Sequence, residues 1–293
     1  MVVEKKINKL VTVHIVDDLI YLAVSRISKN NHYKIKDTVQ LPLNGPALSE
    51  YVLKKRLKRY PVYLVLGGKQ IVTRVINIPD LPQEEIRQAL TWEVSKYIPI
   101  PSEELIFDFE VLNKVSTPSG EQLQLMIIAA RKQYIENYCD ILVNSGLKPM
   151  IVDIEGIVLK YLYSCLESSK GNTNVCCVYL DEHRGVFSFI NNNNLFFVHN
   201  VEWEQEIIIN RLSSEYQRVN NYLQRQMQMP NVTDIYIFGQ VDETLYENLK
   251  AELGLDVNCV NLTDNALKIN TRELDPHYTF AIGLNLREVN NGN

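Results

Sequence analysis

The sequence lacks any apolar run that approaches the roughly 20 residues needed to cross a bilayer. Its first ten residues, MVVEKKINKL, carry charges with no long apolar core behind them, which argues against a signal peptide. Cysteine is also scarce: the five thiols are an odd number, and none stands at metal-ligand spacing. Free thiols are typical of a reducing compartment, so we expect a cytoplasmic protein without disulfides or direct membrane insertion.

Positive charge is in short supply as well. The net charge is -5 with a pI near 5.6, and no extended basic stripe is present, so we expect no nucleic-acid partner. The one basic run, KKRLKR at residues 54–59, is interpreted as a solvated helix face. Contact with an acidic partner or with lipid headgroups is the alternative.

Familiar catalytic motifs are missing. The sequence has no Gly-x-Ser-x-Gly elbow, no Walker-type phosphate loop and no His-Glu-x-x-His zinc motif. The composition, 46% hydrophobic and 22% charged, is nevertheless that of an ordinary globular protein, and 293 residues suffice for one large or two medium domains.

A three-strand meander followed by a helix occurs twice. The repeated units start about 165 residues apart, and each strand has the alternating or β-branched pattern of a half-buried strand. Two related α/β halves with a cleft between them are the simplest architecture. The first unit comprises Val11–Val16, Ile20–Ile27, Tyr33–Leu41 and the helix Ala47–Arg59; the second comprises Val175–Leu180, Gly185–Ile190, Leu195–Val201 and the helix Trp203–Met227.

The segment Ile78–Leu112 is the most distinctive stretch. Pro82 precedes Glu84 and Glu85, and proline and acidic residues both suit the first turn of a helix. Apolar residues then repeat at helical spacing until Pro99 and Pro101, which end the helix because proline has no N–H to continue it. An alternating strand follows.

This order resembles the PilM family, the actin-like cytoplasmic proteins of type IV pilus assembly, in which a proline-bracketed helix ends in Lys-Tyr-Ile-Pro, here Lys96–Pro99. The resemblance covers nearly the whole chain, because fragments similar to the family recur in the same order. These are residues 127–132, residues 145–149 with 152–155, Glu215, Arg218, Tyr222 and Gln226 in one helix, and residues 281–287.

The resemblance implies an α/β, actin-like (ribonuclease H-like) fold with two lobes. We expect residues 1–165 to form the first lobe, with a small α+β subdomain inserted at about 79–148, and residues 166–293 to form the second. In the family, a groove beside the inserted subdomain takes the N-terminal tail of the bitopic membrane protein PilN. Candidate contacts are Trp92, Tyr97, Ile98 and Pro99. A pilus motor ATPase or platform protein is a further implied partner, so the protein would be peripheral to the inner membrane.

The phosphate loops depart from this fold's pattern of Asp-Ile-Gly followed by small residues. In the first loop His14 stands in place of the aspartate and Val16 in place of the glycine. In the second loop Tyr179 replaces the aspartate and Asp181 the glycine. Glycine lets backbone N–H groups approach phosphates, and the aspartates hold hydrated Mg²⁺, so both functions are reduced.

Acidic residues are expected to weaken phosphate binding further. Asp17, Asp18, Asp181 and Glu182 would surround the place of a polyanion, with Arg184 as partial compensation. A like-charge pair at ~4 Å costs about 4 kcal/mol at an effective dielectric of ~20. The adenosine loop keeps Gly239, but Gln240 follows it instead of a second glycine. We therefore expect no cofactor, with ATP and Mg²⁺ bound weakly or not at all. We interpret the acids as turn residues, not metal ligands, and His14 and His183 as simply hydrogen-bonded.

The preferred interpretation is a non-catalytic scaffold, a pseudo-ATPase that binds a PilN-like tail and links it to motor components. The alternative is an active actin-like ATPase or a nucleotide-gated switch of the same family. Relatives of the FtsA or GspL type are disfavoured, because the final residues 287–293 cannot form an amphipathic membrane helix and no transmembrane span follows.

Overall fold

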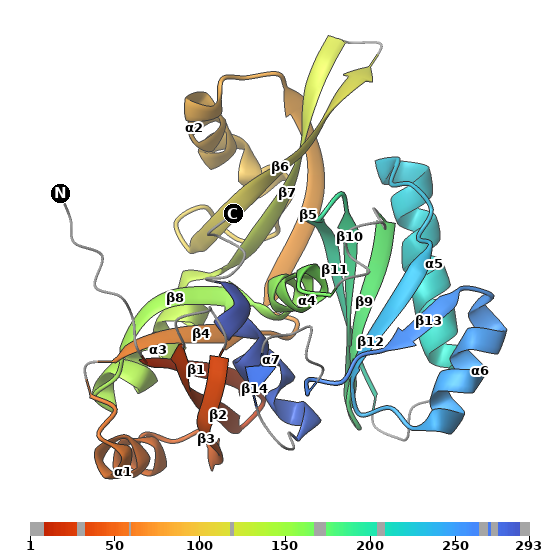
Figure 1. Cartoon of the computed structure of the whole chain (residues 1–293). Coiled ribbons are helices and arrows are strands. Elements are labelled where there is room, and N and C mark those ends of the chain that lie inside the picture. Colours follow the sequence, from red (N-terminus) through yellow and green to blue (C-terminus); the bar gives the residue numbers. More distant parts are fainter. Residues whose placement is uncertain are drawn as a thin grey trace.

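The computed structural model describes residues 9–27, 33–58, 60–117, 120–166, 174–203, 209–263, 269–270 and 275–287. They form two α/β lobes side by side, with a small third sheet projecting from the first lobe (Figure 1). No helix in these ranges is both long and apolar enough to cross a membrane.

The first lobe is built on a six-stranded sheet of order β14-β3-β2-β1-β4-β8. The meander β1–β2–β3 is antiparallel, whereas β4 and β8 continue the sheet parallel to β1. Helices α1 and α3 cover its outer face. The bounds are β1 Lys9–Val16, β2 Leu19–Ile27, β3 Tyr33–Pro42, α1 Gly45–Lys55, β4 Pro61–Leu66, α3 Lys132–Asn144, β8 Lys148–Ile154 and β14 Ile269–Asn270.

The second lobe repeats this plan with a five-stranded sheet of order β11-β10-β9-β12-β13. Its meander β9–β10–β11 is antiparallel, and α5 and α6 cover its outer face. The bounds are β9 Asn174–Leu180, β10 Arg184–Asn191, β11 Asn194–Glu202, α5 Ile209–Met227, β12 Asp234–Gly239, α6 Glu243–Leu253 and β13 Asp256–Cys259. The repeated meander-plus-helix unit predicted from sequence is therefore confirmed.

A central helical layer separates the two sheets. Helices α4 (Glu155–Ser164) and α7 (Thr279–Gly283) lie there, and their apolar residues form one cluster with the inner faces of both sheets. Strand alternation sorts the side chains: Val11, Val13 and Ile15 of β1 pack on the outer helices, so the residues between them face the central layer. In β9 the same alternation turns Tyr179 inward.

The inserted subdomain is a three-stranded antiparallel sheet, β5-β7-β6, with one helix packed on it. Ile86, Leu90 and Val94 bury the helix against the sheet, as the sequence spacing predicts. The bounds are β5 Ile71–Pro79, α2 Gln83–Glu93, the 3-10 turn η1 Val94–Lys96, β6 Leu105–Thr117 and β7 Gly120–Arg131. The unit thus runs from 71 to 131, not 79–148, because α3 and β8 belong to the first lobe.

Other boundaries differ from the sequence prediction for local reasons. Helix α1 ends at Lys55, four residues early, because Arg56 adopts a left-handed conformation at φ 55°. Near the C-terminus the family-like fragment 281–287 is not one continuous helix: the 3-10 turn η4 (Pro276–Tyr278), α7 and the 3-10 turn η5 (Leu284–Leu286) follow one another. Of the helix expected from Trp203, residues 204–208 lie outside the described residues, and α5 begins at Ile209.

The second predicted domain, 166–293, is not confined to one lobe. Strand β14 pairs with β3 of the first sheet, and α7 lies between the sheets. The chain therefore returns to the first lobe after completing the second. The two lobes are thus linked by the path of the chain as well as by packing.

Candidate functional site

The two residues predicted to replace the phosphate-loop aspartates are both buried between the two sheets. His14 comes from β1 and Tyr179 from β9, and both side chains point into the central layer. The ring of Phe280 in α7 lies between them, with centroids 4.9 Å from His14 and 4.6 Å from Tyr179. An aromatic contact therefore occupies the place where the phosphate-loop pattern would put two aspartates.

Glu155, the first residue of α4, is the centre of a buried ion-pair network. Its Oε1 accepts hydrogen bonds from Nε2 of His14 at 2.7 Å and from Nη1 of Arg184 at 2.6 Å. Nε of Arg184 also donates to Oδ2 of Asp181 at 3.2 Å. His14 contributes from the first sheet, Arg184 and Asp181 from the second and Glu155 from the layer between, so the network joins all three.

Burial and neighbouring charges together set the pKa values of Glu155, His14 and Arg184. Burial alone raises the pKa of Glu155, but the charge of Arg184 and the hydrogen bond from His14 outweigh it and hold that pKa at about 2. Burial lowers the pKa of His14, which keeps its imidazole neutral and its Nε2–H available to Glu155. Burial also lowers the pKa of Arg184, but Glu155 and Asp181 outweigh it and raise the pKa. The guanidinium is thus charged and already neutralised by two carboxylates.

Gly67, just after β4, makes room for this network. A β-carbon at this position would overlap the carboxylate of Glu155, so only glycine permits the approach. The carbonyl of Gly67 accepts a hydrogen bond from the hydroxyl of Tyr134 at 2.9 Å, which fixes the turn. Two atoms of the network, Nδ1 of His14 and Oε2 of Glu155, have no hydrogen-bond partner among the described residues.

The predicted acidic ring is smaller than expected. Asp17 and Asp18 are exposed in the β1–β2 turn, where Asp17 has a φ of 51°. Glu182 is exposed too and pairs with His277 at 3.2 Å. Only Asp181 enters the buried network, where its Oδ1 also accepts the backbone N–H groups of residues 183 and 184. The acid that does occupy the centre, Glu155, was not among the predicted site residues.

The remaining loop positions are structural. Val16 is partly buried against the central layer. Gly239 has a φ of 99° and approaches the carbonyl of Leu180 too closely for a β-carbon, while the N–H of Gln240 donates to the same carbonyl at 2.8 Å. Within the described residues, no group of three or more His, Cys, Asp or Glu side chains converges as a metal site. The cysteines are free thiols, as predicted.

A separate groove of about 590 Å³ lies between the inserted subdomain and the first lobe. Its walls are mainly aliphatic, and consecutive residues of two edge strands, 106–108 of β6 and 152–154 of β8, contribute to them. The lining comprises Ile71, Arg87, Ile106, Phe107, Asp108, Ile128, Ala129, Ala130, Ile135, Val152, Asp153, Ile154, Ile157, Tyr161 and Arg287.

Two polar pairs interrupt this apolar surface. Arg87 of α2 bonds Asp108 at 2.5 Å, and both are exposed at the rim. At the base, Oδ2 of buried Asp153 accepts from Nη1 of Arg287 at 2.5 Å and from the hydroxyl of Tyr161 at 3.2 Å. Burial raises the pKa of Asp153, although the charge of Arg287 acts in the opposite direction.

None of the four predicted partner contacts lines the groove. Ile98 is buried in the core of the inserted subdomain, so a partner cannot reach it without unfolding. Trp92 is 79% exposed, and Tyr97 and Pro99 are exposed as well. Arg87, which does line the groove, is five residues from Trp92, and at 3.6 residues per turn the two side chains point about 140° apart.

Three solved structures resemble the chain throughout its length. A PilM–PilN type IV pilus biogenesis complex matches with a TM-score of 0.75 and 19% identity, over 96% of this chain and 98% of that chain. The cytoplasmic domain of EpsL, an inner membrane component of the type II secretion system of Vibrio cholerae, gives 0.56 and 11%, over 97% and 96%. A Bacteroides thetaiotaomicron protein with an actin-like ATPase fold gives 0.52 and 12%, over 92% and 98%. The predicted actin-like fold is confirmed.

The sequence identifies the family more directly than these fold similarities do. A family model described as type IV pilus assembly protein PilM matches residues 46–228, which run from α1 through the inserted subdomain to the end of α5. That stretch contains the whole aliphatic groove except Arg287, together with Glu155, Asp181 and Arg184 of the buried network. The chain therefore belongs to the PilM family of type IV pilus assembly proteins.

Proposed function

We propose that the protein is a non-catalytic scaffold of type IV pilus assembly that holds the N-terminal tail of a PilN-like inner membrane protein in the groove beside its inserted subdomain. It would thereby be held at the cytoplasmic face of the inner membrane through that partner. A motor ATPase or platform protein of the pilus would bind elsewhere on the molecule. The solved PilM–PilN complex of the same fold supports the choice of partner.

The observation that carries the proposal is the groove itself. Its volume of about 590 Å³ lies within the range of roughly 300–1,000 Å³ typical of ligand pockets. Both β6 and β8 are edge strands of their sheets, so their outer backbone groups are available to an extended peptide. An extended segment can gain affinity from such backbone hydrogen bonds and specificity from pockets for alternate side chains.

The lining predicts the chemistry of the bound tail. Aliphatic walls favour apolar side chains on one face of the tail, while Asp153 and Arg287 at the base offer an acceptor and a donor. Because these two already neutralise each other, a neutral polar side chain such as an amide fits there better than a charged one. We therefore expect a short tail with alternating apolar residues and few charges.

The non-catalytic part of the proposal is supported by the buried ion-pair network. Glu155, Asp181 and Arg184 sum to one negative charge when His14 is neutral, and they lie buried among the residues of the two predicted phosphate loops. A polyanion would have to displace Arg184 from two carboxylates and leave them unpaired. Leaving a buried charge unpaired costs about 3–5 kcal/mol.

The groove is tested with the variant Val152→Arg. Val152 is 39% exposed in the groove wall, so arginine there blocks the tail while the fold can accommodate it. Val143→Arg is the matched control, because Val143 is 53% exposed on α3 and outside the groove lining. The probe is a peptide of the N-terminal tail of a PilN-like protein, and its binding is measured by calorimetry.

Loss of an anchor contact costs ~2 kcal/mol or more, so Val152→Arg should weaken the peptide by at least about 30-fold, with Val143→Arg unchanged. Equal affinities for both variants would place the tail elsewhere. If the wild-type protein binds no such tail, the scaffold proposal loses its partner.

Nucleotide binding is tested by thermal unfolding with ATP and Mg²⁺. A ligand at about 100 times its Kd stabilises by about 2.7 kcal/mol, so millimolar ATP would reveal any affinity in the micromolar range. We expect no shift for the wild type, nor for Val16→Gly, in which the missing loop glycine is restored. A reproducible ATP-dependent rise would favour the alternative function, a nucleotide-gated switch.

A further inference from the structure

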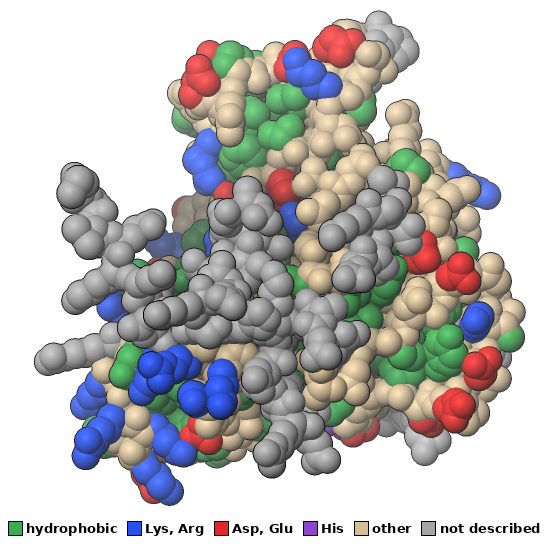
Figure 2. All heavy atoms as spheres, viewed as in Figure 1, with side chains coloured by type: hydrophobic (Ala, Val, Ile, Leu, Met, Phe, Trp, Pro, Cys, Tyr) green, Lys and Arg blue, Asp and Glu red, His purple; other side chains and the backbone are tan. Residues whose placement is uncertain are grey.

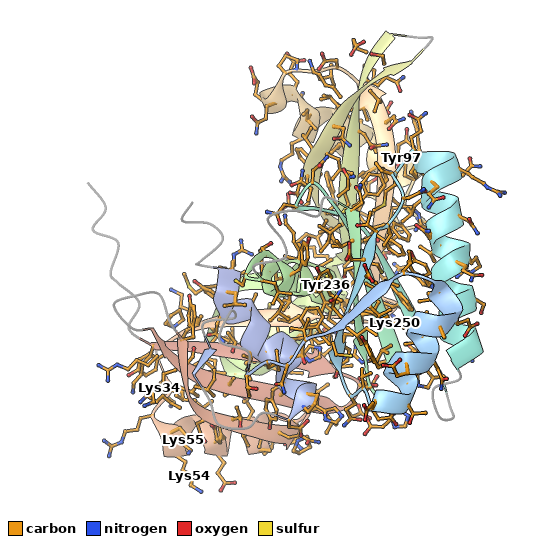
Figure 3. All side chains as sticks on the ribbon, turned by 45° about the vertical axis from the view of Figure 1, so that its right-hand side comes forward. Lys34, Lys54, Lys55, Tyr97, Tyr236 and Lys250 are labelled. Atoms are coloured by element: carbon orange, nitrogen blue, oxygen red, sulfur yellow. The ribbon has the colours of Figure 1, made fainter. Side chains whose placement is uncertain are left out.

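Basic residues gather at one edge of the first sheet, although the chain as a whole is acidic. Figure 2 shows Lys and Arg side chains crowded over α1 and the neighbouring strand ends, and in Figure 3 Lys34, Lys54 and Lys55 project from the same corner. The exposed members of this basic edge are Lys9, Arg26, Lys34, Lys54, Lys55, Arg56, Lys58 and Lys148.

The topology explains the gathering. The parallel strands β1, β4 and β8 all begin at this edge, β2 ends there and β3 begins there. Lys9 and Lys148 are the first residues of β1 and β8. The last turn of α1 reaches the same place, since the stem of Lys58 packs against Gly146 just before β8.

Three of these residues form a row of like charges. Lys9 is directly opposite Arg26 on β2, and Arg26 is directly opposite Lys34 on β3. Like charges directly opposite on adjacent strands destabilise a sheet, and no ion pair with a carboxylate is found for these three among the described residues. Lys9 lies over the ring of Tyr60 at 5.3 Å, but no carboxylate of the described residues balances the row, so an anionic partner outside the chain is its simplest explanation.

The carboxylates near the basic edge are too few to change the sign of its net charge, which stays positive. Asp37 forms an ion pair with Lys55, and Glu50 is exposed one turn before Lys54 on α1. Leu53, 59% exposed, directly precedes the basic residues of that helix and offers an aliphatic contact beside the charges. The charges come from separate strands and a helix and spread over a surface, which suits a charged plane better than a single extended acidic peptide.

We infer that this basic edge binds the surface of an anionic lipid bilayer. Clusters of four to eight Lys or Arg residues recognise anionic lipid, and each contributes about 1 kcal/mol, or roughly fivefold in affinity. Strand β8 connects the edge to the groove: it begins with Lys148, passes exposed Met150 and reaches the groove at Val152. At ~3.3 Å per residue the groove begins about 13 Å from the edge.

This spacing gives the proposed function an orientation. A tail leaving the groove along β8 would meet the bilayer that carries its own membrane span. The lipid contact itself does not depend on the tail, so it is tested without one, and failure of one proposal leaves the other intact.

The experiment is sedimentation with vesicles of phosphatidylcholine containing about one-third phosphatidylglycerol, compared with pure phosphatidylcholine. The test variant is Arg26→Glu with Lys54→Glu. The control, Arg225→Glu with Lys250→Glu, makes the same change in net charge on exposed residues of α5 and α6 in the second lobe. Figure 3 shows Lys250 on the opposite side of the molecule from the basic edge.

We expect wild type and control to bind the anionic vesicles and the test variant to bind at least about 25-fold more weakly, the product of two fivefold terms. Raising salt from about 0.1 M to about 1 M shortens the Debye length from about 10 Å to about 3 Å and should release the wild type. Arg26→Glu alone should raise the unfolding temperature, because it converts the row into opposite-charge pairs, while it weakens lipid binding.

Three outcomes would overturn the inference. One is absence of wild-type binding to anionic vesicles, and another is equal loss in the test and control variants. The third is binding to soluble polyglutamate but not to vesicles, which would assign the basic edge to an acidic protein instead.

Discussion

Replacing Arg184 with methionine is the most direct perturbation of the buried network. The change removes the only guanidinium that contacts Glu155 and Asp181 in the described structure, at 2.6 Å and 3.2 Å, while it keeps most of the side-chain volume. Each contact is worth about 4 kcal/mol of Coulomb energy at ~4 Å and an effective dielectric of ~20, before desolvation is subtracted. Breaking a buried pair costs about 3–5 kcal/mol, and we expect Arg184→Met to lower the free energy of unfolding by that amount.

A second substitution separates charge from packing. Glu155→Gln removes the carboxylate that Arg184→Met leaves unpaired, so the double variant should recover at least about 1 kcal/mol relative to Arg184→Met alone. Arg131→Met is the control, because Arg131 pairs with Glu104 at the exposed surface, where such pairs are worth about 0–1 kcal/mol.

Urea unfolding followed by the fluorescence of Trp203 is the assay. The indole N–H of Trp203 donates to the carbonyl of Glu182 at 2.8 Å, next to the network, and Trp92→Phe removes the only other tryptophan. If Arg184→Met falls within about 1 kcal/mol of the Arg131→Met control, or if Glu155→Gln gives no recovery, the network does not hold the lobes together and the reasoning is refuted.

Three further predictions concern the same residues and Trp92. Gly67→Ala should destabilise the wild type by several kcal/mol, but far less in a Glu155→Ala background, because the added β-carbon then meets no carboxylate; equal costs in urea unfolding would contradict this. Stability should decline as the pH falls. The folded pKa of His14 lies below 6.5, so its contribution is present above pH 6.5 and lost below. The folded pKa of Glu155 is about 2, so its contribution is lost between pH 4.5 and 2, and Glu155→Gln should flatten that part of a pH series of unfolding curves. Trp92→Ala should change the unfolding free energy by less than about 0.5 kcal/mol and leave the affinity for the tail peptide unaltered, since Trp92 is 79% exposed and outside the groove; lost binding in calorimetry would extend the interface to this face of α2.

The architecture could be predicted from sequence because its signals are local. Period-two alternation in the meanders and the apolar row Ile86, Leu90 and Val94 each lie within a dozen residues, and both correspond to observed burial. Boundaries set by a single backbone angle, such as the end of α1 at Arg56, were less predictable. The likeness between the two halves and the position of Asp181 beside Arg184 also followed from sequence.

The centre of the site could not be found this way. Glu155 bonds His14 across 141 residues and Arg184 across 29, and no local pattern distinguishes it from an ordinary acid at a helix start. One signal was available: Gly67 ends a short buried strand, and a glycine there can indicate a close approach. Trp92 stays a prediction as a partner contact, since its position off the apolar row indicates exposure, which is observed, without indicating which partner it meets.

The Glu155 network also bears on timing. A bound nucleotide crosslinks two lobes only while the cell supplies it, and it leaves after hydrolysis. His14, Glu155 and Arg184 are part of the polypeptide, so their effective concentration is fixed by the fold and does not follow the metabolic state of the cell. These ion pairs therefore do not form and break with the binding and release of a nucleotide. Under the proposed function, in which the protein binds no nucleotide, any periodic step of the assembly would be driven by another component.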